Sequence, residues 1–131
     1  MAKITDTAKG LCSIIQFHNA RTRETINIGF AYSDKNHLYL YAPISHPSIM
    51  RYLRMHSSET IVYGIEVLAA MLQRTPSLDE TKIGKHLSMN EPFPVETRGS
   101  GKEAVISLAA TYLSIDTDPF EEELMFVFNV H

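Results

Sequence analysis

The sequence predicts an α+β domain in which an antiparallel sheet of about four to five strands packs against two or three helices. Two observations support this fold class. Between residues 11 and 42, apolar and polar side chains alternate with a period of two, which is typical of β-strands. Between residues 57 and 74, apolar side chains recur every three or four positions, which is typical of an amphipathic helix.

Residues 11–18, "LCSIIQFH", are rich in β-branched and aromatic side chains and predict the first strand. A second strand is expected over 24–33, where Ile26, Ile28, Phe30 and Tyr32 occupy alternate positions. Asp34 to Asn36 form a turn, and 37–42 form the third strand, so 11–42 is an antiparallel meander. Asn27 and Gly29 fall on the side opposite the apolar residues, and Gly29 is expected to mark a bulge or a close backbone approach.

The third strand places Leu38 and Leu40 on one side and Tyr39 and Tyr41 on the other. If the leucines face the core, the tyrosines present a semi-polar aromatic surface of the kind enriched at partner-binding sites. The alternative is that the tyrosines form a second covered layer, under a C-terminal arm. The sequence leaves both readings open.

Two helices are expected next. Pro47, with Ser45 as a cap, predicts a short helix of roughly two turns. The strongest helix follows over 57–74, with Ser57 or Ser58 as its cap and a broad apolar face. We expect this helix to lie across the sheet, with Gly64 permitting close packing against a strand.

The remaining third of the chain predicts one more helix between strands. Residues 82–89 are expected to form a fourth strand, and the prolines within 90–99 indicate an extended edge or loop. Ser100 and Glu103 have the spacing of a capping box, ahead of a helix over 104–113. Residues 116–131 are expected to be an acidic loop followed by a last strand, or an arm that pairs with another subunit.

The composition indicates a single domain over 1–131, because 131 residues that are 44% hydrophobic can bury a sizeable core. Residues 1–9 are expected to form a flexible N-terminus. No apolar run approaches the roughly 18–20 residues that span a membrane, and no signal-like stretch is visible. The single cysteine, Cys12, cannot build a disulfide framework, and it is expected to be buried and inert. These features predict a cytoplasmic protein, in the host cytoplasm if a phage encodes it.

Charge is distributed unevenly along the chain. Residues 1–102 hold all 12 Lys and Arg and nine acids, whereas 103–131 hold six acids and no base. Such asymmetry is typical of a solvated face or of a surface for a polar partner. Nucleic-acid binding is disfavoured because no basic stripe is visible. For a protein partner, the predicted contact residues are Tyr39, Tyr41, Arg51, Arg54, Asp116, Asp118, Glu121 and Glu122.

Motifs for catalysis or for cofactors are not recognised. "GSGK" at 99–102 lacks the remaining residues of a phosphate-binding loop, and the acidic segment 116–123 lacks EF-hand spacing. The six histidines form no metal-binding pair, so neither a metal nor another cofactor is expected. As an alternative ligand site, His46, Arg51, His56 and Lys102 offer residue types that suit phosphate recognition or acid–base chemistry.

The order "CSIIQFHNARTRETINIGFAY" followed by "HLYLYAP" resembles the start of an uncharacterised bacterial and phage domain family. In that family a first strand, a charged turn with "RGE" and an "NIGV"-type strand recur, and members are often encoded beside HipA-like kinases. Arg23-Glu24 and Asn27 to Gly29 match, and "KHLSMNEPFPV" and "KEAVISLAATYL" are similar to the second half. Asn19-Ala20 replaces the usual aspartate-proline turn. The resemblance implies a small accessory protein without an assigned active site.

The sequence therefore predicts a small non-enzymatic binding protein that regulates or inhibits a larger macromolecule, of the accessory type found in phages and mobile elements. One alternative is a protein that binds a small molecule or nucleotide and has hydrolytic activity. Another is a structural homo-oligomer, such as a homodimer, that assembles through the C-terminal arm.

Overall fold

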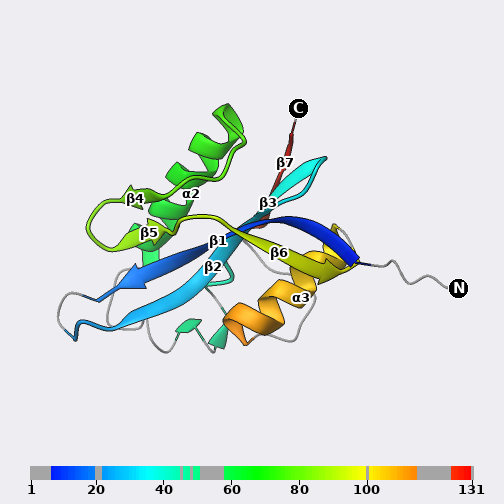
Figure 1. The fold of residues 1–131 in the computed structure, drawn as a ribbon. Helices are drawn as coiled ribbons and strands as arrows, with labels where there is room; N and C mark the ends of the chain where they lie inside the picture. The colour runs from blue at the N-terminus through cyan, green and yellow to red at the C-terminus, as the bar shows by residue number, and fades with distance from the viewer. Residues whose placement is uncertain are drawn as a thin grey trace, which may run out of the picture.

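The computed structural model describes residues 7–19, 22–44, 46–47, 49–50, 58–99, 101–114 and 125–130. These residues form a seven-stranded antiparallel sheet that curls into a half-barrel, together with two helices, α2 and α3 (Figure 1). The predicted architecture, a sheet of four to five strands packed against two or three helices, is therefore wrong, because the described residues form mostly sheet, with seven strands and only two helices. Strands β4 (Thr81–Ile83) and β5 (Leu87–Met89) are each only three residues long, too short for a period of two to be evident, and β6 (Phe93–Arg98) contains Pro94, which had indicated an edge or loop.

The predicted meander is confirmed. Strands β1 (Thr7–His18), β2 (Thr25–Ser33) and β3 (His37–Tyr41) pair antiparallel in sequence order. The β2–β3 turn is fixed by Asp34, whose Oδ1 accepts hydrogen bonds from the backbone N–H groups of Asn36 and His37, each at 2.8 Å. Since β1 begins at Thr7, residues 7–9 belong to the sheet and not to a flexible terminus.

The other edge of β1 is paired with two short strands in succession. Strand β5 (Leu87–Met89) pairs with its second half and β6 (Phe93–Arg98) with its first half. Strand β4 (Thr81–Ile83) pairs with β5. The single strand expected over 82–89 is therefore a hairpin, because Gly84 has a φ of 67° and reverses the chain there.

The C-terminal strand belongs to the same sheet. Strand β7 (Met125–Asn129) pairs with β3, so that the strand order is β4-β5-β1-β2-β3-β7, with β6 also on β1. Of the two alternatives for this segment, a strand within the chain is the one observed.

Helix α2 (Ser58–Arg74) packs on one face of the sheet, as predicted. A Cβ at Gly64 would overlap Cδ1 of Leu87, which shows how closely this helix approaches β5. Leu87 pairs with Phe17, and paired residues share a face. We call this side of the sheet the α2 face. No helix in the described residues is long and apolar enough to cross a membrane.

Helix α3 (Lys102–Leu113) packs on the opposite face, which we call the α3 face. Near its end, the Tyr112 ring meets the Phe93 ring edge-on, with centroids 5.7 Å apart. The residue that caps the start of α3 is Gly101, and no side chain makes a capping hydrogen bond there. The predicted cap position is therefore wrong, and Ser100 itself lies outside the described residues.

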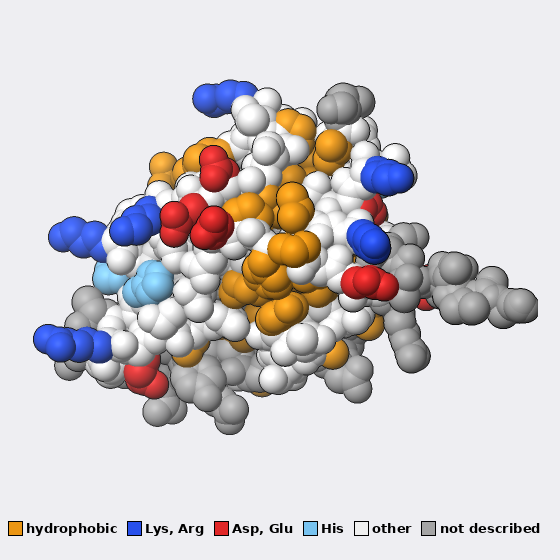
Figure 2. Space-filling model, in the orientation of Figure 1, with side chains coloured by type: hydrophobic (Ala, Val, Ile, Leu, Met, Phe, Trp, Pro, Cys, Tyr) orange, Lys and Arg blue, Asp and Glu red, His pale blue; other side chains and the backbone are white. Residues whose placement is uncertain are grey.

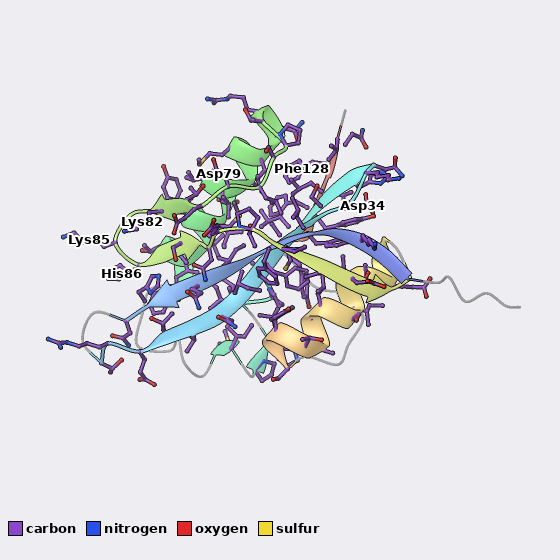
Figure 3. The ribbon with its side chains drawn as sticks, in the orientation of Figure 1. Asp34, Asp79, Lys82, Lys85, His86 and Phe128 are labelled. Carbon is purple, nitrogen blue, oxygen red and sulfur yellow. The ribbon has the colours of Figure 1, made fainter. Side chains whose placement is uncertain are left out.

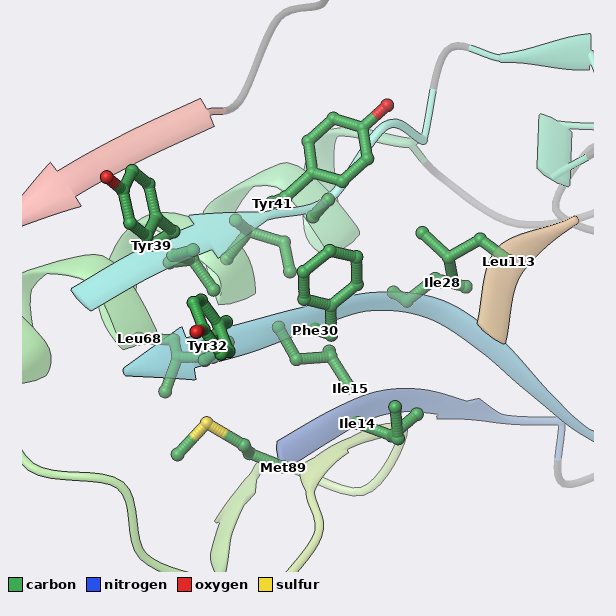
Figure 4. Close-up of a cluster of buried hydrophobic side chains, with 14 of the residues drawn as sticks. Ile14, Ile15, Ile28, Phe30, Tyr32, Tyr39, Tyr41, Leu68, Met89 and Leu113 are labelled. Carbon is green, nitrogen blue, oxygen red and sulfur yellow. The ribbon is translucent and has the colours of Figure 1, made fainter. Parts of the chain in front are cut away.

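The tyrosines of β3 are buried and do not form a surface. Tyr39 is 7% exposed, and Tyr41 and its neighbour Tyr32 are fully buried. Their rings group with Phe30 on β2 and β3 (Figure 4). Tyr39 also lies against the start of α3, since a Cβ on Gly101 would come within 3.2 Å of its hydroxyl oxygen. The expected aromatic surface is therefore absent, and the covered layer is what the structure shows.

Strand β2 contains the expected irregularity. The register shifts between Ile15 and Gln16, so that Gly29 pairs with Ile15 and Asn27 pairs with Gln16, with Ile28 as the extra residue. A Cβ at Gly29 would overlap the Tyr41 carbonyl oxygen, which confirms a close backbone approach. The bulge also turns Asn27 to the α3 face, so the prediction that Asn27 and Gly29 share a side is wrong.

Candidate functional site

Past the C-terminal end of α3, the α3 face of the sheet changes from apolar to polar. Cys12, Phe30 and Tyr32, which lie on this face, are completely buried. Toward the end of β1 at His18 and the start of β2 at Thr25, the same face carries amides, hydroxyls and an imidazole. We call this set the polar band; it comprises Gln16, His18, Thr25, Asn27, Ser88 and Asn90.

One chain of side-chain hydrogen bonds in the polar band links amides across the strands. Asn90 Nδ2 donates to Gln16 Oε1 at 3.0 Å, and Gln16 Nε2 donates to Asn27 Oδ1 at 2.9 Å. Asn27 Nδ2 then donates to the carbonyl oxygen of Tyr112 in α3, at 3.3 Å. The bulge in β2 makes this chain possible, because it brings Asn27 onto the same face as Gln16.

A second chain centres on His18. Its Nδ1 lies 3.0 Å from the Thr25 hydroxyl oxygen, and its Nε2 lies 2.7 Å from the Ser88 hydroxyl oxygen. A neutral imidazole carries one N–H and one lone pair, whereas a hydroxyl can donate or accept. When Nδ1–H donates to Thr25, Nε2 is the acceptor and the Ser88 O–H donates to it. The ring is therefore held at both nitrogens.

The backbone around His18 is fixed to the β4–β5 turn. The His18 N–H donates to the carbonyl oxygen of His86 at 2.7 Å, and His86 Nδ1 lies 3.1 Å from the carbonyl oxygen of His18. The ring of Phe17 lies 5.9 Å from that of His86, on the other face of β1. These contacts tie the hairpin to the end of β1 and set the position of Ser88 relative to His18.

A cavity of about 580 Å³ opens beside the polar band. Lys82 is the register partner of Ser88, so its side chain leaves the sheet on the same face. Both Lys82 and Lys85 project at this end of the molecule, near His86 (Figure 3), and Figure 2 shows basic, acidic and histidine side chains gathered there. The residues that line the cavity are His18, Glu80, Lys82, Gly84, Lys85, Leu87, Ser88 and Asn90.

The groups around this cavity are mainly hydrogen-bond donors or groups able to donate. Its lining residues carry two ammonium groups, a hydroxyl, an amide and an imidazole, against one carboxylate from Glu80. Within the described part of the chain, neither Lys82 nor Lys85 forms an ion pair. Charge-assisted hydrogen bonds to a carboxylate or phosphate would satisfy such a set. Among the described residues, no group of three His, Cys, Asp or Glu could hold a metal ion.

The residues predicted from sequence do not form this site. Tyr39 and Tyr41 lie in the core. His46 precedes a short helical segment after β3 and does not line the cavity, and the side chain of Lys102, at the start of α3, is not described. The other predicted residues lie outside the described residues: Arg51, Arg54, His56, Asp116, Asp118, Glu121 and Glu122.

The sequence offered only a weak signal for the residues that do converge. Gln16 and His18 alternate with the apolar Ile15 and Phe17, which indicates a polar face at the end of β1. Ser88, however, is 70 positions from His18, and only the β1–β5 register brings the two together.

The lone cysteine is separate from the site. Cys12 is completely buried under α3, and burial raises the pKa of its thiol from 9.0 to about 12. A thiol that stays protonated is a poor nucleophile and a poor metal ligand. The predicted burial of Cys12 is confirmed, and the raised pKa favours an inert thiol.

Comparisons with known proteins supply no relative: no family model, no curated protein and no solved structure matches the chain. The resemblance built on Arg23-Glu24 and Asn27 to Gly29 therefore stays a prediction. Function has to be inferred from the polar band and its cavity.

Proposed function

We propose that this domain binds a small anionic molecule in the cavity beside the polar band. One observation carries the proposal: a cavity of about 580 Å³ whose lining includes Lys82, Lys85 and Ser88. Sites for small molecules have volumes of roughly 300–1,000 Å³ and a few well-placed polar groups. The alternative function expected from the sequence, small-molecule or nucleotide binding, is thus proposed at a different place in the fold.

The charges around the cavity favour an anion. Lys82 and Lys85 contribute two positive charges, and Glu80 contributes one negative charge. Flexible lysine ammonium groups bind carboxylate or phosphate as point charges. A phosphate monoester such as AMP and a dicarboxylate such as succinate are the two ligand types that these donors suit best.

The test is thermal unfolding and isothermal titration with inorganic phosphate, succinate and AMP. At least one of these anions should raise the melting temperature saturably. A Lys82→Ala, Lys85→Ala double variant should lose that shift, whereas Lys35→Ala, in the exposed turn after β2, should keep it. The proposal fails if none of the three anions binds, or if the double variant binds as tightly as the unaltered chain.

Binding of a protein partner, the function expected first from the sequence, is the second candidate. A mainly apolar cavity of about 360 Å³ lies between α2 and the β4–β5 hairpin, on the α2 face. Tyr63, 68% exposed, stands among its lining residues with Ile83 and Leu87. An exposed tyrosine beside an apolar pocket is typical of a site that accepts a partner's side chain.

Affinity capture from cytosol tests this second candidate. A stoichiometric partner should be captured by the unaltered chain and by Glu66→Ala, an exposed control on α2, but not by Tyr63→Ala. Equal capture by both variants would remove Tyr63 from the interface. A cytoplasmic setting belongs to both proposals, because a single buried thiol suits a reducing compartment.

A further inference from the structure

We propose that Ser88 is an acyl-accepting nucleophile and that His18 is its general base, so that the domain cleaves a small ester that carries a negative charge. This inference rests on the proposed function, because the ester would occupy the same cavity. The observation behind it is the 2.7 Å separation between Ser88 Oγ and His18 Nε2, at the wall of that cavity. A hydroxyl this close to an imidazole acceptor is in the geometry that activates serine.

The Thr25 hydroxyl can accept a hydrogen bond from Nδ1–H, which is the tautomer that this chemistry needs. A base at Nε2 requires the proton of the neutral ring to be on Nδ1, and Nδ1 lies 3.0 Å from Thr25 Oγ1. Thr25 is thus a positioning residue, the third group that orients the base toward the nucleophile. Its hydroxyl does not touch the reacting atoms.

Lys82 supplies positive charge where a tetrahedral adduct would need it. Ser88 and Lys82 are opposite one another on β5 and β4, and Cβ atoms of such pairs are about 4.5–5.5 Å apart. The flexible lysine stem lets the ammonium reach the carbonyl oxygen of an acyl group attached to Ser88 Oγ. Stabilisation of that oxygen as it becomes an oxyanion lowers the barrier to attack. Lys85, which also lines the cavity, binds the remote anionic group of the substrate.

The reaction balances without a cofactor. Ser88 Oγ forms a bond to the ester carbonyl carbon while its proton passes to His18 Nε2. The oxyanion then collapses, the bond from carbon to the leaving oxygen breaks, and the His18 proton passes to that oxygen. A water molecule next attacks the acyl group, with His18 again taking and returning a proton. The carboxylic acid leaves, and Ser88 regains its hydroxyl.

The experiment uses a fluorophosphonate probe, with mass spectrometry to locate the adduct. The unaltered chain should be labelled at Ser88, and Ser88→Ala should not be labelled. His18→Gln should be labelled at least about 10²-fold more slowly, the size of a general-base contribution. Ser77→Ala, which removes an exposed serine elsewhere, should behave like the unaltered chain. Labelling that spares Ser88, or that proceeds at the same rate in His18→Gln, overturns the inference.

Two further measurements separate catalysis from structural support. With a 4-nitrophenyl ester of succinic acid, Thr25→Val should lower kcat several-fold and leave KM nearly unchanged. Ser88→Cys keeps His18 in place, and its new thiol should react with iodoacetamide about tenfold faster than that of a free cysteine. A Ser88→Cys thiol that reacts no faster overturns the inference even if the His18 variant does not fold. Anion binding that persists without labelling at Ser88 overturns this inference alone, whereas absence of anion binding overturns the proposed function.

Discussion

His18 and Ser88 are 70 positions apart in the chain, yet Nε2 of the imidazole lies 2.7 Å from the serine hydroxyl oxygen. Their meeting depends on the pairing of β1 with β5, in which Gln16 lies opposite Ser88 and Phe17 opposite Leu87. A one-residue slip of β5 would turn Ser88 to the α2 face and separate the pair. The geometry of the candidate site therefore depends on the packing that sets this register.

Gly29 should tolerate no side chain. A Cβ there would overlap backbone atoms of Tyr41 and Ala42, and Tyr41 is held by the pairing of β3 with β2. We expect Gly29→Ala to lower the free energy of unfolding by about 3 kcal/mol, measured by urea denaturation. The control is Gly84→Ala, where a positive φ strains the backbone but no atom lies within 4 Å; about 1 kcal/mol is expected there. Equal losses would contradict the close approach of β3.

At Gly64, we expect a neighbouring side chain, and not backbone atoms, to limit which substitutions are tolerated. Gly64→Val would press on Cδ1 of Leu87, and we expect a loss of about 2 kcal/mol in unfolding free energy. In a Leu87→Ala background the same substitution should cost clearly less, since the obstructing methyl group is gone. A double-mutant cycle measures this coupling. A cycle with no coupling would show that α2 does not rest on β5 at this point.

Cys12 should make the protein sensitive to alkali. Its pKa is raised from 9.0 to about 12, so the folded state disfavours the thiolate. The stabilisation is complete below pH 9 and is lost as the pH rises toward 12, by on the order of 4 kcal/mol in all. Between pH 8 and pH 10.5, the unaltered chain should lose about 2 kcal/mol more than Cys12→Ala does in urea denaturation. Parallel losses in both proteins would contradict the burial of the thiol.

Burial also raises the pKa values of Tyr32 and Tyr39, and this burial is common to both proteins, whereas the charge of a Cys12 thiolate makes a further, smaller contribution to the raised pKa of Tyr32. Iodoacetamide gives an independent check at neutral pH. The folded chain should be modified only through unfolding, because a protonated, buried thiol does not react.

Tyr41 should behave as a core residue. It is fully buried, with its ring 5.7 Å from that of Phe30. Tyr41→Ala should cost about 3–5 kcal/mol of unfolding free energy, whereas Tyr63→Ala, at an exposed position on α2, should stay within about 0.5 kcal/mol of the unaltered chain. Thermal or urea denaturation distinguishes the two. A small loss for Tyr41→Ala would restore the surface interpretation of the β3 tyrosines.

The strands and the helix that were predicted correctly are those that patterns among neighbouring residues determine. The meander over 11–42 followed from alternation and from the Asp34 turn, and α2 followed from its apolar periodicity. The hairpin of β4 and β5 was not predicted, because each of these strands has only three residues, which are too few to show a period of two. Pairing partners of such short strands are decided by tertiary contacts.

The candidate site could not be predicted for a related reason. Whether Tyr39 faces solvent depends on α3, a helix that begins more than sixty positions later in the chain. The polar band likewise depends on the bulge at Ile28, which turns Asn27 toward Gln16, and on the pairing of β5 with β1. Gly29 indicated the bulge, but neither the position of α3 over Tyr39 nor the pairing of β5 with β1 is evident in a short stretch of sequence.

The most direct test of the central claim is a two-dimensional ¹H–¹⁵N NMR titration of the folded chain with succinate and AMP. If the cavity beside the polar band binds an anion, the backbone N–H signals of His18, Lys82 and Ser88 should shift saturably, and those of the 34–36 turn should not. Saturable shifts confined to other parts of the sheet, or no saturable shift with either anion, would contradict the account.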